Sequence, residues 1–242
     1  MSLFVLGDTH LSLGVPGKPM DIFGGWENYM TLIETHWKRL IQPEDTVVLA
    51  GDISWGMTLA EAKADFAFLH ALPGTKIILK GNHDYWWNSM KKMMEFFTAN
   101  GFDSLRILHN NCYAYEGFGI CGTRGWVNIP GELNAKGEPA DESVSGDVKV
   151  LRREEQRLRV SLQAAKSQGL QPIAFLHYPP IYWNNRNELM LNALHDFGVK
   201  DCYYGHLHGA VTHARAEKNT VDGITYHLIA GDYLQFVPEK IL

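Results

Sequence analysis

The stretch KIILKGNHDYWW, residues 76–87, joins an apolar segment directly to a cluster of polar groups. Its first part, Ile-Ile-Leu at 77–79, has the apolar, β-branched character of a buried strand. The residues that follow carry oxygen and nitrogen atoms that need hydrogen bonds or a metal ion, and they are Asn82, His83 and Asp84. The stretch therefore predicts a buried strand with a chemical site at its carboxyl end.

Four other apolar segments end in polar side chains of the same kind. FVLGDTH ends in Asp8 and His10, VVLAGDIS in Asp52, IAFLHYPP in His177, and DCYYGHLHG in His206 and His208. A single Asp, Asn or His after a strand is usually a turn or loop residue, but five such junctions are hard to attribute to chance. Because sites in open α/β sheets form beyond the carboxyl ends of the strands, we expect these side chains to converge.

The other six histidines are expected to be hydrogen-bonded structural residues; they are His36, His70, His109, His195, His213 and His227.

Apolar residues at helical spacing predict helices over residues 26–40, 58–69, 86–97, 147–165 and 187–197. Thr58 and Glu61 form a capping box at the start of the second helix. Residues 106–122 predict antiparallel strands. The alternation of helices and strands, without a repeat or a linker, indicates one α/β domain spanning residues 1–242.

Residues 125–147 are polar and rich in Gly and Pro, which predicts a long surface loop. Loops of this length without secondary structure are uncommon unless they act as lids or binding loops. We therefore expect this segment to be a lid or a specificity element of the site.

Length and composition are those of a globular protein, with 242 residues, 45% hydrophobic and 20% charged. The net charge of −5 gives no general basic footprint for nucleic acid. No apolar run approaches the ~18 residues of a membrane span, and the N-terminus has no signal-peptide pattern. Three cysteines without CxxC spacing argue against a disulfide framework. A cytoplasmic enzyme or binding domain is the expectation.

The number of candidate ligands indicates two metal ions. The candidate ligands exceed the four that are typical of a single zinc site. They are seven: Asp8, His10, Asp52, Asn82, His177, His206 and His208. Asp52 is the expected bridge, because it is the only ligand in its loop. Mixed imidazole and carboxylate ligation without thiolate fits Mn, Fe or Zn. Two divalent ions and two carboxylates leave a charge of roughly +2, which suits an anionic phosphoester.

The ordered motifs DxH, GD, GNHD, H and GHxH, from Asp8 to His208, resemble the calcineurin-like metallophosphoesterase family. The resemblance implies a four-layer αββα sandwich, with two mixed sheets flanked by helices. It also implies two divalent transition-metal ions, with manganese as the favoured metal. One would be held by Asp8, His10, Asp52 and His208, and the other by Asp52, Asn82, His177 and His206.

The resemblance also implies a mechanism and assigns roles beside the metals. A metal-bound hydroxide would attack a phosphoester in line, with a phosphodiester favoured over a monoester. His83 is similar to the family's catalytic histidine that is not a ligand, near the leaving-group oxygen. The neighbouring Asp84 is the second catalytic candidate. Arg124 is the candidate for binding a phosphate oxygen bidentately, although a surface salt bridge is an equal alternative for it.

The sequence departs from the protein serine/threonine phosphatases of this superfamily. They carry GDxxDRG where this chain reads GDISWG, and GNHE where it reads GNHD. A small phosphoester substrate, nucleotide-like ones included, is therefore expected rather than a phosphoprotein. Tyr85, Trp86 and Trp87 could stack on a nucleobase, but helix packing is the stronger expectation, since Trp86 fits the inward stripe.

Three other functions remain open. The chain could be a phosphomonoesterase, or a non-catalytic scaffold of the same fold that binds protein partners. A scaffold would be expected to lose ligands, and none is missing here. A nuclease would need a basic groove or an added DNA-binding domain, so neither stable nucleic-acid binding nor membrane binding is expected. The oligomeric state is left open.

Overall fold

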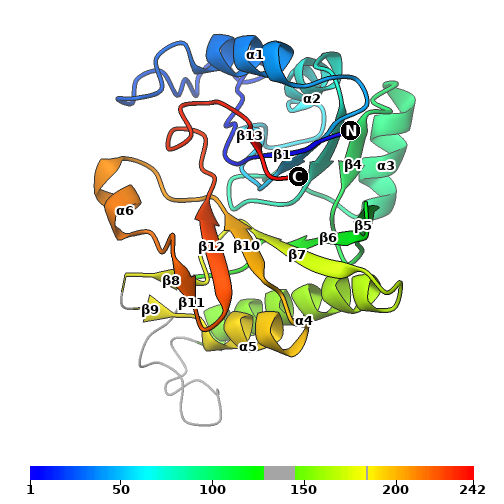
Figure 1. Cartoon of the computed structure of the whole chain (residues 1–242). Coiled ribbons are helices and arrows are strands. Elements are labelled where there is room, and N and C mark those ends of the chain that lie inside the picture. Colours follow the sequence, from blue (N-terminus) through cyan, green and yellow to red (C-terminus); the bar gives the residue numbers. More distant parts are fainter. Residues whose placement is uncertain (128–144, 184) are drawn as a thin grey trace.

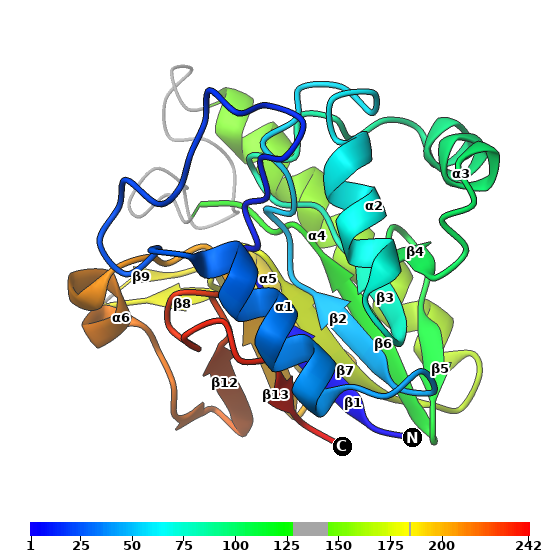
Figure 2. The ribbon, with the colours of Figure 1, turned by 90° about the horizontal axis from the view of Figure 1, so that it is seen from above.

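The computed structural model describes residues 1–127, 145–183 and 185–242. Two β-sheets stack on one another, and helices cover the outer face of each (Figures 1 and 2). The predicted fold class, a mixed α/β sandwich of four layers, is confirmed. No helix of the described ranges is long and apolar enough to cross a bilayer.

The first sheet has the strand order β13-β1-β2-β3-β4. Its strands are β1 (Leu3–Leu6), β2 (Thr46–Leu49), β3 (Thr75–Ile78), β4 (Leu105–Ile107) and β13 (Glu239–Lys240). The first four are parallel, and β13 pairs antiparallel with β1. They are connected through α1 (Tyr29–Leu40), α2 (Lys63–Ala71) and α3 (Met90–Ala99). The carboxyl ends of the parallel strands therefore lie at one edge.

The second sheet has the order β11-β12-β10-β7-β6-β5. Its strands are β5 (Tyr113–Tyr115), β6 (Phe118–Thr123), β7 (Gln171–Leu176), β10 (Asp201–Tyr204), β11 (Thr220–Val221) and β12 (Ile224–Leu228). The four central strands are parallel, and each edge strand is antiparallel to its neighbour. The helices α4 (Ser145–Lys166) and α5 (Glu188–Asp196) pack together over this sheet, with α4 against β6 and β7. A short hairpin, β8 (Ile181–Tyr182) and β9 (Asn185–Arg186), and α6 (Ala210–Arg215) complete the elements.

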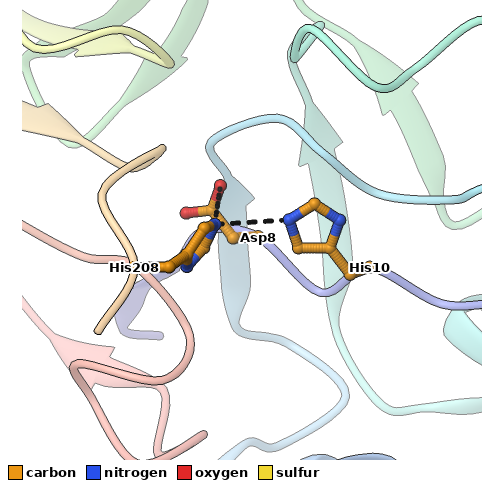
Figure 3. A group of neighbouring side chains, drawn as sticks. All are labelled: Asp8, His10 and His208. Carbon is orange, nitrogen blue, oxygen red and sulfur yellow. Dashed lines mark hydrogen bonds and ion pairs between the residues drawn. The ribbon is translucent and has the colours of Figure 1, made fainter. Parts of the chain in front are cut away.

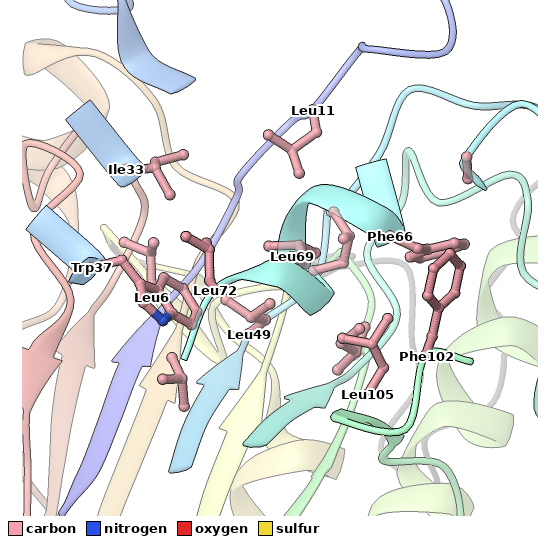
Figure 4. Close-up of a cluster of buried hydrophobic side chains, with 14 of the residues drawn as sticks. Leu6, Leu11, Ile33, Trp37, Leu49, Phe66, Leu69, Leu72, Phe102 and Leu105 are labelled. Carbon is pink, nitrogen blue, oxygen red and sulfur yellow. The ribbon is translucent and has the colours of Figure 1, made fainter. Parts of the chain in front are cut away.

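The core has three layers because the central strands are apolar on both faces. On β1, Phe4 and Leu6 face the helices, while Leu3 and Val5 face the other sheet, which is the period of two of an extended strand. Figure 4 shows the helix-side layer, where Trp37 of α1 and Phe66 and Leu69 of α2 pack with Leu6 and Leu49. The second layer lies between the two sheets and includes Val48, Ile77, Ile173 and Phe175. The third layer lies between the second sheet and the helices α4 and α5, and it includes Leu158, Leu162 and Leu191.

Several helix starts differ from the sequence prediction. The helix expected from residue 26 begins at Tyr29, and the one expected from residue 86 begins at Met90, after its N-cap Ser89. The capping-box contact of Thr58 with the Glu61 amide is present at 3.2 Å, but α2 begins only at Lys63. The antiparallel pattern is right for β5 and β6 and wrong for β4, which is parallel to β3.

The expected surface loop at 125–147 falls mostly outside the described residues, which omit 128–144. Helix α4 already begins at Ser145, so the expected cap Asp147 lies in its first turn.

Candidate metal centre

All seven expected ligands lie in loops that follow the carboxyl ends of strands. In the first sheet, the loop after β1 carries Asp8 and His10, the loop after β2 carries Asp52, and the loop after β3 carries Asn82. In the second sheet, His177 follows β7, and His206 and His208 follow β10. A connected set of contacts joins them across the two sheets, so the structure brings the seven together at one rim.

One group comprises Asp8, His10 and His208, whose ligand atoms all lie within 4.8 Å of one another. Figure 3 shows Nε2 of His208 between the other two side chains. It lies 3.7 Å from Oδ1 of Asp8 and 3.3 Å from Nε2 of His10. A carboxylate oxygen and two imidazole nitrogens thus face a shared space, which is a suitable arrangement for a transition-metal ion.

A second group surrounds His177, which is fully buried. Its Nδ1 lies 3.1 Å from the Ala50 carbonyl oxygen. A carbonyl only accepts, so Nδ1 carries the hydrogen and Nε2 presents a lone pair. That lone pair faces Oδ1 of Asn82 at 2.7 Å and Nδ1 of His206 at 3.3 Å. Oδ1 of Asn82 and Nε2 of His177 are both acceptors, so the contact between them has no hydrogen and fits a bound cation.

Asp52 lies between the two groups. Its Oδ2 is 3.5 Å from Nε2 of His10 and 3.5 Å from Nε2 of His177. Asp8 also approaches His177, at 3.7 Å, but through Nδ1, whose hydrogen goes to the Ala50 carbonyl. Asp52 therefore contacts one histidine of each group through the same oxygen.

Burial sets the protonation states of these groups. It lowers the pKa of His177 to about 3 and that of His206 to about 2, and it lowers the pKa of His10 well below its usual value. These imidazoles are therefore neutral, with lone pairs free to bind a metal. Burial also raises the pKa of Asp8 and that of Asp52. Cations among these carboxylates would offset that desolvation.

The backbone is shaped around the ligands. A methyl group at Gly205 would lie 2.3 Å from Oδ2 of Asp8, and one at Gly81 would lie 2.0 Å from Oδ1 of Asp52. These glycines let neighbouring loops approach the carboxylates closely. Four of the expected ligand residues have left-handed backbone, at a cost on the order of 1–2 kcal/mol each; their φ angles are 56° for Asp8, 42° for His10, 51° for Asp52 and 73° for His206.

Asp232 is a site residue that the sequence analysis missed. Its Oδ1 accepts a hydrogen bond from Nδ1 of His208 at 2.9 Å, and its Oδ2 lies 3.3 Å from Nε2 of His213. Burial acts to lower the pKa of His208, but the bond to Asp232 and the nearby carboxylates raise it overall. The signal was available, because TYHLIAGD, residues 225–232, is a further apolar strand that ends in Gly-Asp.

Two tryptophans pack against the first group of expected ligands. The Trp26 ring lies 5.5 Å from that of His10 and 5.4 Å from that of His208, with edge-on geometry. Trp55 stacks on His10 at 5.1 Å. The Tyr29 hydroxyl donates to the His10 carbonyl at 2.9 Å. Trp26, expected in a helix stripe, thus lies before α1 and shields the site.

His83 and Asp84 occupy different environments. The half-buried His83 donates its backbone N–H to Oδ1 of Asp52 at 2.8 Å, and its ring lies 4.3 Å from that of Trp55. Asp84 is fully buried. Its carboxylate accepts from Gly81 N–H at 2.7 Å, Ile53 N–H at 2.8 Å, Ser54 N–H at 3.3 Å and Nε1 of Trp86 at 2.9 Å. These bonds tie the loop after β3 to the loop after β2.

Arg124, at the end of β6, is an ion-pair partner of Glu154 on α4, at 3.4 Å. Its guanidinium also lies over the Trp126 ring, 4.4 Å from the centroid. The backbone carbonyl of Arg124 accepts from the His177 N–H at 3.1 Å. The residue is thus adjacent to the ligand loop after β7.

The chain is similar to one protein family and to several solved structures. A family model described as calcineurin-like phosphoesterase matches residues 1–210. Among solved structures, phosphopantetheinyl hydrolase (PptH) from Mycobacterium tuberculosis is 12% identical over 100% of this chain and 95% of that chain, with a TM-score of 0.55. A protein of unknown function, AQ665 from Aquifex aeolicus, is 14% identical over 99% and 95% of the two chains, with a TM-score of 0.49. No curated protein matches the chain.

Proposed function

The chain belongs to the calcineurin-like phosphoesterase family, and on this premise we propose that it is a phosphohydrolase with two divalent transition-metal ions, manganese first among them. The observation that carries the proposal is the convergence of unprotonated imidazole nitrogens and carboxylate oxygens on both sides of Asp52. Two such ions, when bound, activate water and offset the charge of a phosphoester.

The proposed division of the ligands follows the two groups of contacts. Asp8, His10, Asp52 and His208 would hold one ion, and Asp52, Asn82, His177 and His206 would hold the other. Asn82 supports this assignment because its amide oxygen adds a ligand without adding a negative charge that would repel substrate.

His83 is the proposed general acid for the leaving-group oxygen. Its backbone bond to Asp52 anchors it beside the proposed ligands; its side chain is half-buried, and its Nδ1 is buried without a hydrogen-bond partner among the described residues. A histidine that no metal engages can give a proton to the departing oxygen. For Asp84 we propose a positioning role, because four donors already occupy its carboxylate and hold the loops of Asp52 and Asn82 together.

A phosphodiester is the favoured substrate because two cavities are bordered by residues of the loops that carry the proposed ligands, one cavity for each substituent. One, of about 210 Å³, is bordered by the ligand His206 and by apolar or aromatic residues that include Val127, Tyr178 and Tyr182. The other, of about 260 Å³, contains Arg124, the proposed phosphate-binding residue. A monoester would fill only one of them.

Metal analysis combined with assays on bis- and mono-p-nitrophenyl phosphate tests the proposal. The protein loaded with Mn should hydrolyse the diester with the higher kcat/KM, and the metal-free protein should hydrolyse neither. Asn82→Ala should lose metal and activity together, whereas Asn100→Ala, at the half-buried C-cap of α3, should keep both. A fully loaded protein without activity toward either ester would favour the scaffold alternative.

A further inference from the structure

We propose that the cavity next to Arg124 is a subsite for a second phosphate of the substrate, so that the preferred substrate is a phosphoester that carries another phosphate group. This inference rests on the proposed hydrolase function and narrows its substrate class. The cavity, called the basic cavity below, has a volume of about 260 Å³. Its lining residues include Lys80, Arg124, Arg157, Glu154, Trp87 and His109.

The charges of the basic cavity are unbalanced. Among the described residues that line the basic cavity, the buried Glu154 carries the one carboxylate. Glu154 accepts from Arg157 at 2.5 Å and from Thr123 Oγ1 at 2.5 Å, and Arg124 lies 3.4 Å from it. Among the lining residues, the cations of Lys80, Arg124 and Arg157 thus outnumber the one carboxylate, with Asp84 behind the lining also acting on Lys80. Such an excess in a concave, partly desolvated site attracts an anion.

The ion pairs with Glu154 do not engage every hydrogen-bond donor of the basic cavity. Nε of Arg124 is buried and has no hydrogen-bond partner within the described ranges. Burial lowers the pKa of His109, as does the charge of Arg157, so His109 is a neutral donor or acceptor there. A phosphate offers three or four acceptor oxygens to several N–H donors at once, and guanidinium groups match it in shape. The chemistry of the lining therefore favours phosphate.

The basic cavity adjoins the proposed metal centre through two loops. Lys80 precedes the ligand Asn82 by two positions on the loop after β3. Arg124 accepts the backbone N–H of the ligand His177 with its carbonyl at 3.1 Å. A phosphoester at the metals can therefore place a second anionic group in the cavity. Trp87 and His109, whose rings meet edge-on at 5.8 Å, form its aromatic wall.

Two substrates that differ by a single phosphate test the inference. Thymidine 5′-(p-nitrophenyl phosphate) and its 3′-phosphorylated form contain the same scissile diester and release the same p-nitrophenolate. We expect the wild type to prefer the 3′-phosphorylated form in kcat/KM. Lys80→Met and Arg157→Met should each reduce that preference by about tenfold, the usual effect of losing a charge-assisted hydrogen bond. Glu154→Gln should increase it, and Lys63→Met, at an exposed position on α2, should leave it unchanged.

A binding measurement on metal-free protein separates this inference from the hydrolase proposal. Isothermal titration with thymidine 3′,5′-bisphosphate should give tighter binding than titration with thymidine 5′-monophosphate, and Lys80→Met should remove the difference. Opposite shifts in Lys80→Met and Glu154→Gln could not come from misfolding. Equal binding of the two nucleotides, or a preference that survives Lys80→Met, would overturn the subsite. Tighter bisphosphate binding without hydrolysis of any ester would keep the subsite and overturn the hydrolase.

Discussion

His208 donates its Nδ1 hydrogen to Asp232 over 2.9 Å, and its other nitrogen, Nε2, faces Asp8 at 3.7 Å. This bond fixes both the tautomer and the orientation of the ring. A carboxylate behind a histidine ligand also makes the ligand nitrogen more basic. Asp232 thus acts on the proposed metal centre without being one of its ligands.

Removal of this support should weaken one metal site. Asp232→Ala should reduce the affinity for one of the two ions by about 10–100-fold, the usual effect of losing such a partner. Asp201→Ala is the matched control, because Asp201 lies 3.1 Å from Nε2 of His227, a histidine outside the centre. Competition with a fluorescent chelator measures both affinities. Equal losses in the two variants would show only a general effect on stability.

The number of metal ions is the second prediction. Elemental analysis after Mn loading should give about two ions per chain, because seven ligands with one bridge serve two sites. Asp52→Asn should weaken both sites, since Oδ2 of Asp52 contacts His10 and His177 equally. His10→Ala should weaken mainly one, and His195→Ala, on α5, should weaken neither. A loaded wild type with a single ion would refute the dinuclear centre.

The third prediction concerns proton transfer by His83. His83→Ala should keep its metals while kcat falls by about 10²–10⁴-fold, the usual contribution of general acid catalysis. The fall should be steep for an alkoxide or ribose leaving group and shallow for p-nitrophenolate, which leaves without a proton. Parallel losses for both leaving groups would indicate that His83 orients substrate instead. Loss of metal would place it among the ligands.

The fourth prediction changes no ligand at all. In Gly205→Ala the new methyl group would meet Oδ2 of Asp8 at 2.3 Å, so the carboxylate or the loop must move. A displacement of about 1 Å at a reacting site lowers the rate by about 10²-fold. We expect this loss in kcat/KM together with weaker metal binding. In Gly24→Ala the methyl group meets nothing within 4 Å, so that variant should behave as wild type.

The arrangement of the ligands was predictable because it depends on one general property of parallel sheets. Strands that run in the same direction present their carboxyl ends at one edge, so Asp8, Asp52 and Asn82 could be placed together from their positions after apolar segments. The same rule could have found Asp232, which follows β12. It was overlooked although Asp52 follows its strand in the same Gly-Asp pair.

Contacts between distant elements could not be predicted in this way. The apolar spacing of Trp26 fits the stripe of the following helix, but the ring packs instead against His10 and His208, which only the folded chain brings near. Similarly, the pairing of Arg124 with Glu154 depends on the packing of α4 over β6. Local patterns determine the period of an element, whereas tertiary contacts determine where it starts and what its side chains touch.

The pairing of β13 with β1 joins segments of the first sheet that leave the ribosome at very different times. During synthesis, β1, β2 and β3 emerge early, with an edge of β1 that stays open until residues 239–240 arrive. His10 and His208 are 198 positions apart. A nascent chain therefore presents Asp8 and Asp52 long before the imidazoles that complete their sites. N-terminal regions fold first as they are made, so metal uptake at full affinity by the proposed centre must wait until His208 has left the ribosome.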